Sequence, residues 1–272
     1  MDVKTIGVTG AGSMGRRIAY VAAFGGDRTV LEDVSPAMLE EGAAYTREAF
    51  EERVARGKVT RERRDKALAN FEVADSVQDA CREADLLIEA VPEELEVKLK
   101  IFTILDQFSK PNAIRASNAS SLSIAEMAAI TFRAESCVGI HFFNPVPKMK
   151  LLEVVRRLGT SDTTVAKCVG VGLRMGKEVV VVREMPGFIR SHIKTMIGNE
   201  AFFMLREGLA SAEDIDIALK LSLNHPMGPF ELVDLVGLDV LLSIIEHLHK
   251  TLGEKCRPCP LLAQYMKAGR LG

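Results

Sequence analysis

Two residues of the sequence have the types and the spacing of a general base and its carboxylate partner. His141 begins the run His-Phe-Phe-Asn-Pro-Val-Pro, and Glu153 follows it by twelve residues. A carboxylate that accepts a hydrogen bond from one imidazole nitrogen fixes the tautomer and stabilises the imidazolium, so the other nitrogen can act as a base near neutral pH. This chemistry suits alcohol oxidation, in which the hydroxyl proton goes to histidine and a hydride goes to a second acceptor. A histidine that follows an apolar strand is nevertheless more often a hydrogen-bonded core residue.

A glycine-rich turn near the start of the chain has the spacing of a dinucleotide fingerprint. Gly10, Gly12 and Gly15 form the pattern Gly-x-Gly-x-x-Gly, with Ser13 and Met14 between the last two glycines. The first glycine permits the tight turn, the second lets the backbone approach a pyrophosphate, and the third lets helix and strand pack closely. The N–H groups at the start of the following helix would then bind the phosphates.

Asp33 strengthens this interpretation because it ends the second expected strand, eighteen residues after Gly15. A carboxylate there binds the adenosine ribose hydroxyls and repels a 2′-phosphate. We therefore expect NAD rather than NADP, and the adjacent Glu32 adds to that preference. The alternative is a glycine-rich turn with a surface aspartate, which the common register of strand, helix and acid makes the poorer interpretation.

The glycine-rich turn, Asp33 and the pair His141 and Glu153 can form one site only if a sheet brings them to the same edge. β-branched runs alternate with helical stretches such as Pro36–Arg56 and Glu93–Phe108. The expected strands are Thr5–Thr9, Arg28–Asp33, Asp85–Ala90, Ala113–Ala116, Cys137–His141, Lys150–Val155 and Glu178–Val182. The alternation predicts an α/β fold with a Rossmann-type, mostly parallel sheet and helices on both faces. A hairpin-like return between the fifth and sixth strands would bring His141 and Glu153 together.

The strand pattern stops at the run Met185-Pro186-Gly187-Phe188. Beyond it we expect only helices, namely Ile193–Glu207, Ser211–Leu221 and Gly237–Lys250. The sequence therefore predicts an NAD-binding Rossmann domain over residues 1–185 and a smaller all-helical domain over residues 186–272.

The charge balance bears on the class of partner. Lys and Arg number 35 against 37 Asp and Glu, which gives a formal net charge of −2. No global basic field exists to hold a nucleic acid or an anionic membrane, so we expect a small-molecule substrate. No apolar run approaches the roughly 20 residues that span a bilayer, and no secretory leader is recognisable.

The cysteines indicate a reducing compartment. There are five, an odd number at scattered positions, which argues against a secreted disulfide framework. We expect free thiols and a cytoplasmic protein, although a mature organellar chain has the same features. His247, His249, Cys256 and Cys259 superficially suggest a zinc site, but histidines two apart on a helix point to different faces, so we expect no metal.

The segment over residues 53–66 concentrates Lys and Arg, including Lys58 and Lys66, in a short helical hairpin. A solvated charged face is the more common explanation of such a run. A clamp for substrate phosphates is the alternative.

Taken together, the motifs resemble the 3-hydroxyacyl-CoA dehydrogenases, including the bacterial 3-hydroxybutyryl-CoA dehydrogenases, over nearly the whole chain. The matching stretches are GAGSMG, ADLLIEAVPEELEVK (84–98), SNASSLSI (117–124), HFFNPVP with Glu153, PGFI (186–189), NEA (199–201), EDID (213–216) and PMGPFELVDLVGLD (226–239). The resemblance implies oxidation of an L-3-hydroxyacyl-CoA to 3-oxoacyl-CoA with NAD, and a homodimer formed through the helical domain.

The resemblance also implies roles for single residues. His141 is then the catalytic base and Glu153 its partner, while Ser120 binds near the reacting oxygen and the nicotinamide. Glu93 and Lys98 match cofactor-contacting positions. A further match is Asn144, which is similar to a residue that lines the nicotinamide and substrate pocket. The basic hairpin with Lys58 and Lys66 falls where the family meets CoA, so the clamp becomes the preferred interpretation.

Two departures from the family pattern leave other functions open. Ser191 and His192 stand where relatives carry Asn and Arg, and Ser191 would be the residue near the substrate carbonyl. Arg17 occupies a position that is commonly glycine, where it either clashes or reaches a phosphate. One alternative is a related dehydrogenase of a small hydroxy acid or other alcohol without CoA, which Arg190, Ser191 and His192 motivate. The other is a non-catalytic NAD-binding protein, structural or regulatory, similar to the crystallin relatives of such enzymes.

Overall fold

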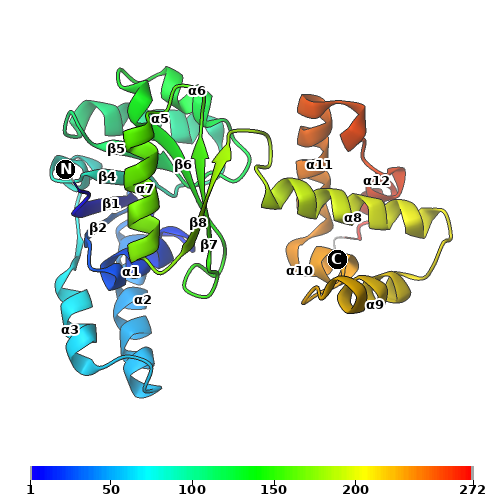
Figure 1. Ribbon diagram of the computed structural model, residues 1–272, viewed down its shortest axis with the longest axis horizontal. Helices are drawn as coiled ribbons and strands as arrows, with labels where there is room; N and C mark the ends of the chain where they lie inside the picture. Colours follow the sequence, from blue (N-terminus) through cyan, green and yellow to red (C-terminus); the bar gives the residue numbers. More distant parts are fainter. Residues whose placement is uncertain (1, 271–272) are drawn as a thin grey trace. The chain divides into compact units, whose positions relative to one another are not determined.

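The computed structural model describes residues 2–270 and divides them after Glu184 into two compact units. The first unit is built around one sheet and the second consists of helices (Figure 1). These elements confirm the predicted α/β class with a smaller all-helical domain.

The sheet of the first unit has eight strands in the order β3-β2-β1-β4-β5-β6-β7-β8. Their bounds are β1 Thr5–Thr9, β2 Arg28–Glu32, β3 Phe71–Val73, β4 Leu86–Glu89, β5 Ile114–Ser117, β6 Cys137–Phe142, β7 Leu151–Arg156 and β8 Glu178–Arg183. All seven predicted strands are present within one residue at either end. Strand β3 was not predicted, because an alternation over only three residues is too short to identify a strand.

Neighbouring strands of this sheet run parallel except for the antiparallel pair β6 and β7. Every residue of β1, β4, β5 and β6 is buried, as expected for parallel strands covered on both faces. The chain runs outward from β1 in both directions, first to β2 and β3 on one side and then to β4 and β5 on the other. The direction of strand succession therefore reverses beside β1. In open α/β sheets ligands bind at the carboxyl edge near such a reversal.

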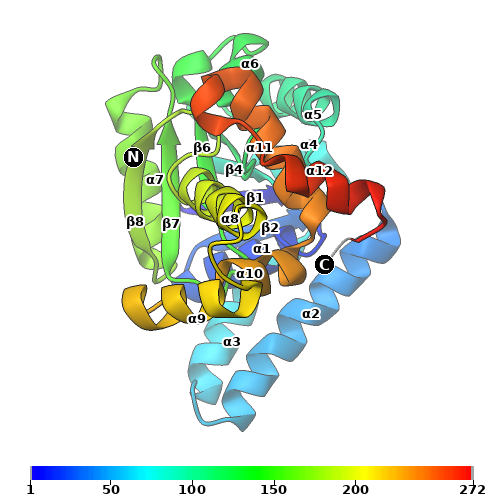
Figure 2. The ribbon, with the colours of Figure 1, turned by 90° about the vertical axis from the view of Figure 1, so that its right-hand side faces the viewer.

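Seven α-helices flank the sheet. They are α1 Gly15–Gly25, α2 Pro36–Ala55, α3 Arg61–Ala69, α4 Val77–Arg82, α5 Leu95–Phe108, α6 Ile124–Ala129 and α7 Asp162–Arg174. Helices α1 and α7 contact each other on one face, while α5 contacts α4 and α6 on the other. Both ribbon views show α2 and α3 as a hairpin that extends away from the sheet (Figure 2).

Side-chain caps explain where several of these helices begin. The hydroxyls of Ser35, Thr60, Ser76, Ser123 and Ser161 each accept a hydrogen bond from a backbone N–H of the first turn of the helix that follows. Such caps satisfy donors that have no partner within the helix and contribute about 1 kcal/mol each. The first helix α1 lacks a side-chain cap, so its N-terminus is left for other acceptors.

The second unit contains α8 Arg190–Arg206, α9 Ala212–Leu223, α10 Pro229–Val236, α11 Leu238–Leu252 and α12 Pro260–Lys267. Its core includes Phe202, Leu241, Ile245, Leu248 and Leu262. Helix α8 begins three residues earlier than predicted, since its first turn carries the charged and polar Arg190, Ser191 and His192 rather than apolar residues. Within residues 2–270, no helix has the length and apolar character needed to cross a membrane.

Candidate active site

His141 and Glu153 face each other across the antiparallel pair β6 and β7. The register places the two residues directly opposite, and opposite residues of an antiparallel pair point to the same face. Nδ1 of His141 lies 2.8 Å from Oε2 of Glu153, with the histidine 5% and the glutamate 0% exposed. The Phe143 ring lies 4.4 Å from the imidazole, centroid to centroid. Because Nδ1 of the buried imidazole faces the Glu153 carboxylate, Nε2 is the ring nitrogen on the side away from that carboxylate.

The glycine-rich turn joins β1 to α1 in a form that admits no side chain at two positions. Gly10 has a φ of 98°, and a Cβ there would lie 2.9 Å from the backbone of Ala90. A Cβ on Gly15 would lie 1.7 Å from the carbonyl oxygen of Gly10. A Cβ on Gly12, by contrast, would meet no atom within 4 Å among the described residues. The turn is closed toward the protein and open at Gly12, which fits a backbone cradle for a diphosphate.

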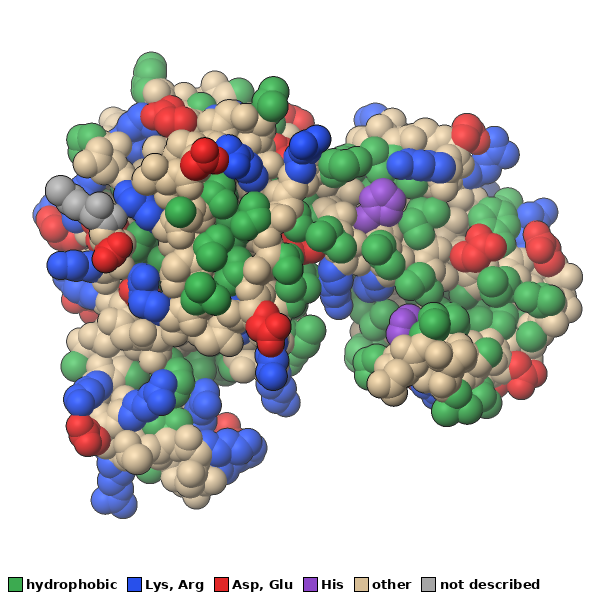
Figure 3. All heavy atoms as spheres, in the orientation of Figure 1, with side chains coloured by type: hydrophobic (Ala, Val, Ile, Leu, Met, Phe, Trp, Pro, Cys, Tyr) green, Lys and Arg blue, Asp and Glu red, His purple; other side chains and the backbone are tan. Residues whose placement is uncertain are grey.

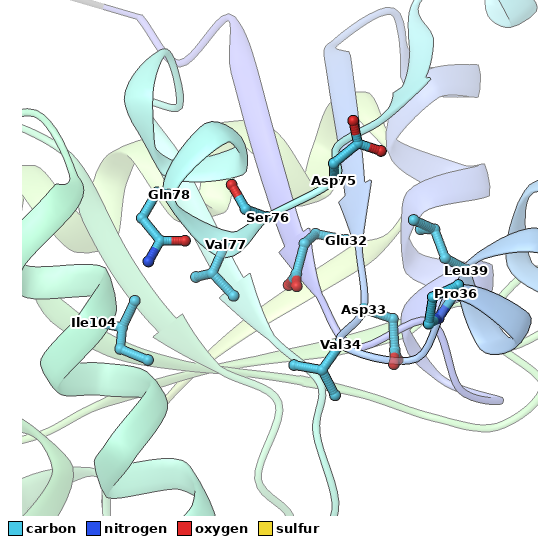
Figure 4. Close-up of a pocket in the computed structure, with 10 residues that line it drawn as sticks. All are labelled: Glu32, Asp33, Val34, Pro36, Leu39, Asp75, Ser76, Val77, Gln78 and Ile104. Carbon is cyan, nitrogen blue, oxygen red and sulfur yellow. The ribbon is translucent and has the colours of Figure 1, made fainter.

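Asp33 connects this cradle to the end of β2. Its Oδ2 accepts a hydrogen bond from the Ala11 N–H at 2.7 Å, and its Oδ1 accepts one from the Ser35 N–H at 2.8 Å. Asp33 also lines a hollow of about 440 Å³ at the carboxyl edge of the sheet (Figure 4). A fixed carboxylate at the rim of a hollow is suited to bind ribose hydroxyls.

Arg17 folds back over the same turn instead of clashing with it. Its guanidinium donates hydrogen bonds to the carbonyl and the hydroxyl of Ser13, and it lies 5.3 Å from the centroid of the Tyr45 ring. Ser13 is exposed and Met14 precedes the first helical residue. A positive charge therefore lies beside the open side of the cradle, where it would favour a phosphate.

Glu93, Lys98 and Ser120 come together at the ends of β4 and β5. Nζ of Lys98 lies 2.7 Å from Oε1 of Glu89 and 3.3 Å from Oε2 of Glu93. Oε1 of Glu93 accepts hydrogen bonds from the N–H of Ser120 at 2.8 Å and from its hydroxyl at 3.2 Å. Burial opposes ionisation of Glu93, but the Lys98 charge and the backbone N–H groups of Ser120 and Ser121 outweigh it and lower its pKa. The charged Glu93 thereby holds the loop that carries Ser120.

Two residues that the sequence did not single out complete this network. Glu89 is fully buried and accepts a hydrogen bond from the Ser117 hydroxyl at 2.6 Å, in addition to its ion pair with Lys98. Burial raises its pKa despite these partners. Oδ1 of Asn118 accepts the Phe142 N–H at 2.9 Å, which ties the loop after β5 to the end of β6 next to the histidine. Glu89 could have been identified from the sequence as an acidic residue at the end of an otherwise apolar strand.

The other predicted site residues lie further from these contacts or outside the first unit. Asn144 is exposed in the turn that follows β6. Ser191 is a buried residue in the first turn of α8, in the second unit. Lys58 is exposed between α2 and α3, and the exposed Lys66 on α3 forms an ion pair with Glu62 at 2.7 Å.

Basic side chains cluster on the α2–α3 hairpin (Figure 3). Several of them have acidic partners on the hairpin itself, since Arg56 pairs with Glu52 and Arg64 pairs with Glu51. These pairs support the interpretation as a solvated face for those arginines, whereas no ion pair involves Lys58 among the described residues. In the second unit, Cys256 and Cys259 are buried in its core and His249 lies 3.2 Å from Glu254. Residues 2–270 contain no cluster of three or more metal-ligating side chains.

Comparison with models of protein families shows to which family the chain belongs. Residues 5–185 match the model of the 3-hydroxyacyl-CoA dehydrogenase NAD-binding domain, and residues 187–272 match that of the 3-hydroxyacyl-CoA dehydrogenase C-terminal domain. The chain belongs to the 3-hydroxyacyl-CoA dehydrogenase family. It is therefore an NAD-dependent oxidoreductase, and the predicted activity on 3-hydroxyacyl-CoA is confirmed at the level of the family.

Individual relatives are similar to this dehydrogenase along its full length. It is 42% identical to the probable 3-hydroxybutyryl-CoA dehydrogenase of Bacillus subtilis, over 100% of this chain and 95% of that protein. Identity to the 3-hydroxybutyryl-CoA dehydrogenase of Bradyrhizobium diazoefficiens is 45%, over 99% and 92%. The crystal structure of (S)-3-hydroxybutyryl-CoA dehydrogenase from Ralstonia eutropha is similar with a TM-score of 0.96 at 40% identity, covering 100% of this chain and 96% of that one.

Proposed function

We propose that this enzyme oxidises a short L-3-hydroxyacyl-CoA, with 3-hydroxybutyryl-CoA as the first candidate, and that His141 is its general base. The buried bond between His141 and Glu153 is the observation that supports this most strongly. NAD, when bound, accepts a hydride from the carbinol carbon. His141 takes the hydroxyl proton at Nε2, and Glu153 holds the ring by Nδ1 and stabilises the imidazolium that forms.

The neighbouring residues have supporting roles in this proposal. The Ser120 hydroxyl orients the reacting oxygen, in a loop that the Glu93 carboxylate fixes through hydrogen bonds from Ser120 and Ser121. Asn144, three residues after His141, lines the pocket of the nicotinamide and the substrate. Gly10, Gly12 and Gly15 hold the diphosphate, which requires backbone rather than side chain at the turn.

Replacement of His141 by glutamine tests the base directly. Loss of a positioned general base lowers kcat by about 10²- to 10⁴-fold, while binding of NADH, followed by its fluorescence, changes no more than a few-fold. The matched control is His249→Gln, because His249 also lies beside a carboxylate, on α11 and far along the chain from the proposed site. Turnover of His141→Gln within a few-fold of the wild type would show that the base is another group.

The CoA requirement is tested by comparing acetoacetyl-CoA with free acetoacetate as oxidants of NADH. We expect only the thioester to react at a useful rate, with Lys58, Lys66 and Ser191 as binding residues. The double change Lys58→Ala and Lys66→Ala should raise KM for acetoacetyl-CoA a few-fold, more at low ionic strength than at high. Reaction of the free acid alone would instead favour a hydroxy-acid dehydrogenase, and tight NADH binding with no turnover would favour the non-catalytic alternative.

We also propose that the chain is a homodimer that works in a reducing compartment such as the cytoplasm. Leu209, Leu221, Leu223 and Leu235 of the second unit are 57–82% exposed, and contact with a second copy of the chain would bury such apolar surface. All five cysteines are buried free thiols, which agrees with a reducing compartment. Light scattering after gel filtration tests the dimer, and a monomer at micromolar concentration would refute it.

A further inference from the structure

Glu32 is a buried carboxylate at the end of β2 that no part of the proposed catalytic machinery uses. It is 2% exposed, and its Oε2 has no hydrogen-bond partner within residues 2–270. Figure 4 shows the carboxylate pointing into the hollow that Asp33 borders. Leaving a buried polar atom without a partner costs free energy, so such an atom in a hollow indicates a ligand that supplies the partner.

The groups that face Glu32 are acidic or neutral. On its own strand end is Asp33, the loop before α4 contributes Asp75 to the hollow, and the packed helix α4 contributes Cys81. Thr9 lies directly opposite on β1. The cations Lys98 of α5 and Arg115 of β5 are paired with other acids, Lys98 with Glu89 and Glu93 and Arg115 with Asp106.

This environment disfavours the ionised form of the side chain. Burial, together with the neighbouring charge of Asp33, raises the pKa of Glu32 to about 7. A substantial fraction of the side chain is therefore a neutral carboxyl at neutral pH. A neutral carboxyl can donate one hydrogen bond and accept another, whereas a carboxylate can only accept.

The remaining walls of the hollow suit a planar aromatic base. Val34, Leu39, Val77 and Ile104 contribute apolar surface to the lining, and Asp33 lies at the rim where the ribose assignment places a sugar. Adenine carries ring nitrogens that accept hydrogen bonds and an amino group that donates them. A neutral carboxyl can satisfy one group of each kind, and a charged one would be dehydrated beside the base and repelled by the diphosphate.

We propose that Glu32 is a positioning residue for the adenine of NAD and that it holds the base as a neutral carboxyl, so that cofactor binding takes up a proton from solvent. The inference rests on NAD use and on the assignment of Asp33 to the adenosine ribose. It adds to them a pH dependence of affinity that the glycine-rich turn and Asp33 do not produce.

Calorimetric titration with ADP-ribose tests this without any turnover. ADP-ribose lacks the nicotinamide, so the ligand has no ring to place beside His141. If only the neutral form binds, the Kd of the wild type should rise about tenfold between pH 6 and pH 8, since the neutral fraction falls by that factor around a pKa of about 7. The Kd of Glu32→Gln, a neutral side chain of the same shape, should change less than about twofold and be lower than that of the wild type at pH 8.

A matched control and a second measurement make the result decisive. Glu72→Gln removes an exposed carboxylate from the neighbouring strand β3, outside the residues that line the hollow, and should keep the tenfold rise. Titrations of the wild type at pH 8 in two buffers of different ionisation enthalpy should show net proton uptake, which requires no variant to fold.

Three results would overturn the inference. They are equal pH slopes for the wild type and Glu32→Gln, tighter binding by the wild type as pH rises, and no proton uptake. Binding of ADP-ribose without these effects refutes only the role of Glu32. No binding at any pH would also refute the adenosine site on which the inference rests.

Discussion

Replacing Glu153 by glutamine removes a negative charge from a fully buried position while keeping the shape of the side chain. The carboxylate lies 2.8 Å from Nδ1 of His141 and is 0% exposed, so solvent cannot compensate for its loss. A hydrogen bond to a charged partner contributes about 1.5–3 kcal/mol. Because the imidazole becomes charged only as it accepts the substrate proton, this energy acts in the transition state. We expect kcat to fall about 10- to 150-fold.

Initial rates of NADH oxidation by acetoacetyl-CoA measure this effect. The KM for the thioester and the Kd for NADH should stay within about threefold, since Glu153 makes no contact that ground-state binding needs in our proposal. The matched control is Glu254→Gln, which changes an exposed carboxylate beside His249 and should leave kcat unchanged. The reasoning is wrong if Glu153→Gln keeps kcat within threefold of the wild type, or if the loss appears in KM alone.

Three further predictions concern binding and stability. The unfolding free energy of the ligand-free wild type should fall by up to about 3 kcal/mol as pH rises from 4.5 to 7, because Glu32 ionises at lower pH in the unfolded chain than in the folded one. Urea titrations should show no such fall for Glu32→Gln. Gly15→Ala places a Cβ 1.7 Å from the Gly10 carbonyl oxygen and should weaken NADH binding at least tenfold by fluorescence titration, whereas wild-type affinity would show that the turn adapts. Lys98→Met leaves Glu89 buried without its cation and should lower the unfolding free energy by about 3–5 kcal/mol in urea, a loss under 1 kcal/mol being the contrary result.

The central part of the sheet could be predicted because its strands are buried on both faces. Such strands appear in the sequence as short β-branched runs between polar or glycine-containing segments, and β1 and β4 are good examples. Strand β3 lies at the edge of the sheet, and its last two residues are exposed. Its extended conformation depends on pairing with β2, which is a tertiary contact that no local pattern records.

The site likewise has one part that could be predicted from the sequence and one part that could not. The pair His141 and Glu153 could be predicted from spacing, because a short return between two strands brings residues of similar distance from the turn together. The contact between Glu93 and Ser120 could not, since these residues belong to loops after different strands and meet only through the order of the sheet. For them the resemblance to a family gave the position but not the bonds.

The two buried acids at the carboxyl edge show why protonation in particular cannot be inferred from residue type. The parallel register aligns Glu32, Thr9, Glu89 and Ser117 in one row across four adjacent strands, so both glutamates lie at the same level of the sheet. Glu89 receives an ion pair from Lys98 of α5 and a hydrogen bond from Ser117. Glu32 lies two strands away from Glu89, on β2, and faces the hollow instead. Equal side chains at equal depth thus serve different purposes: the partnered acid holds the fold together, and the unpartnered acid is left for the cofactor.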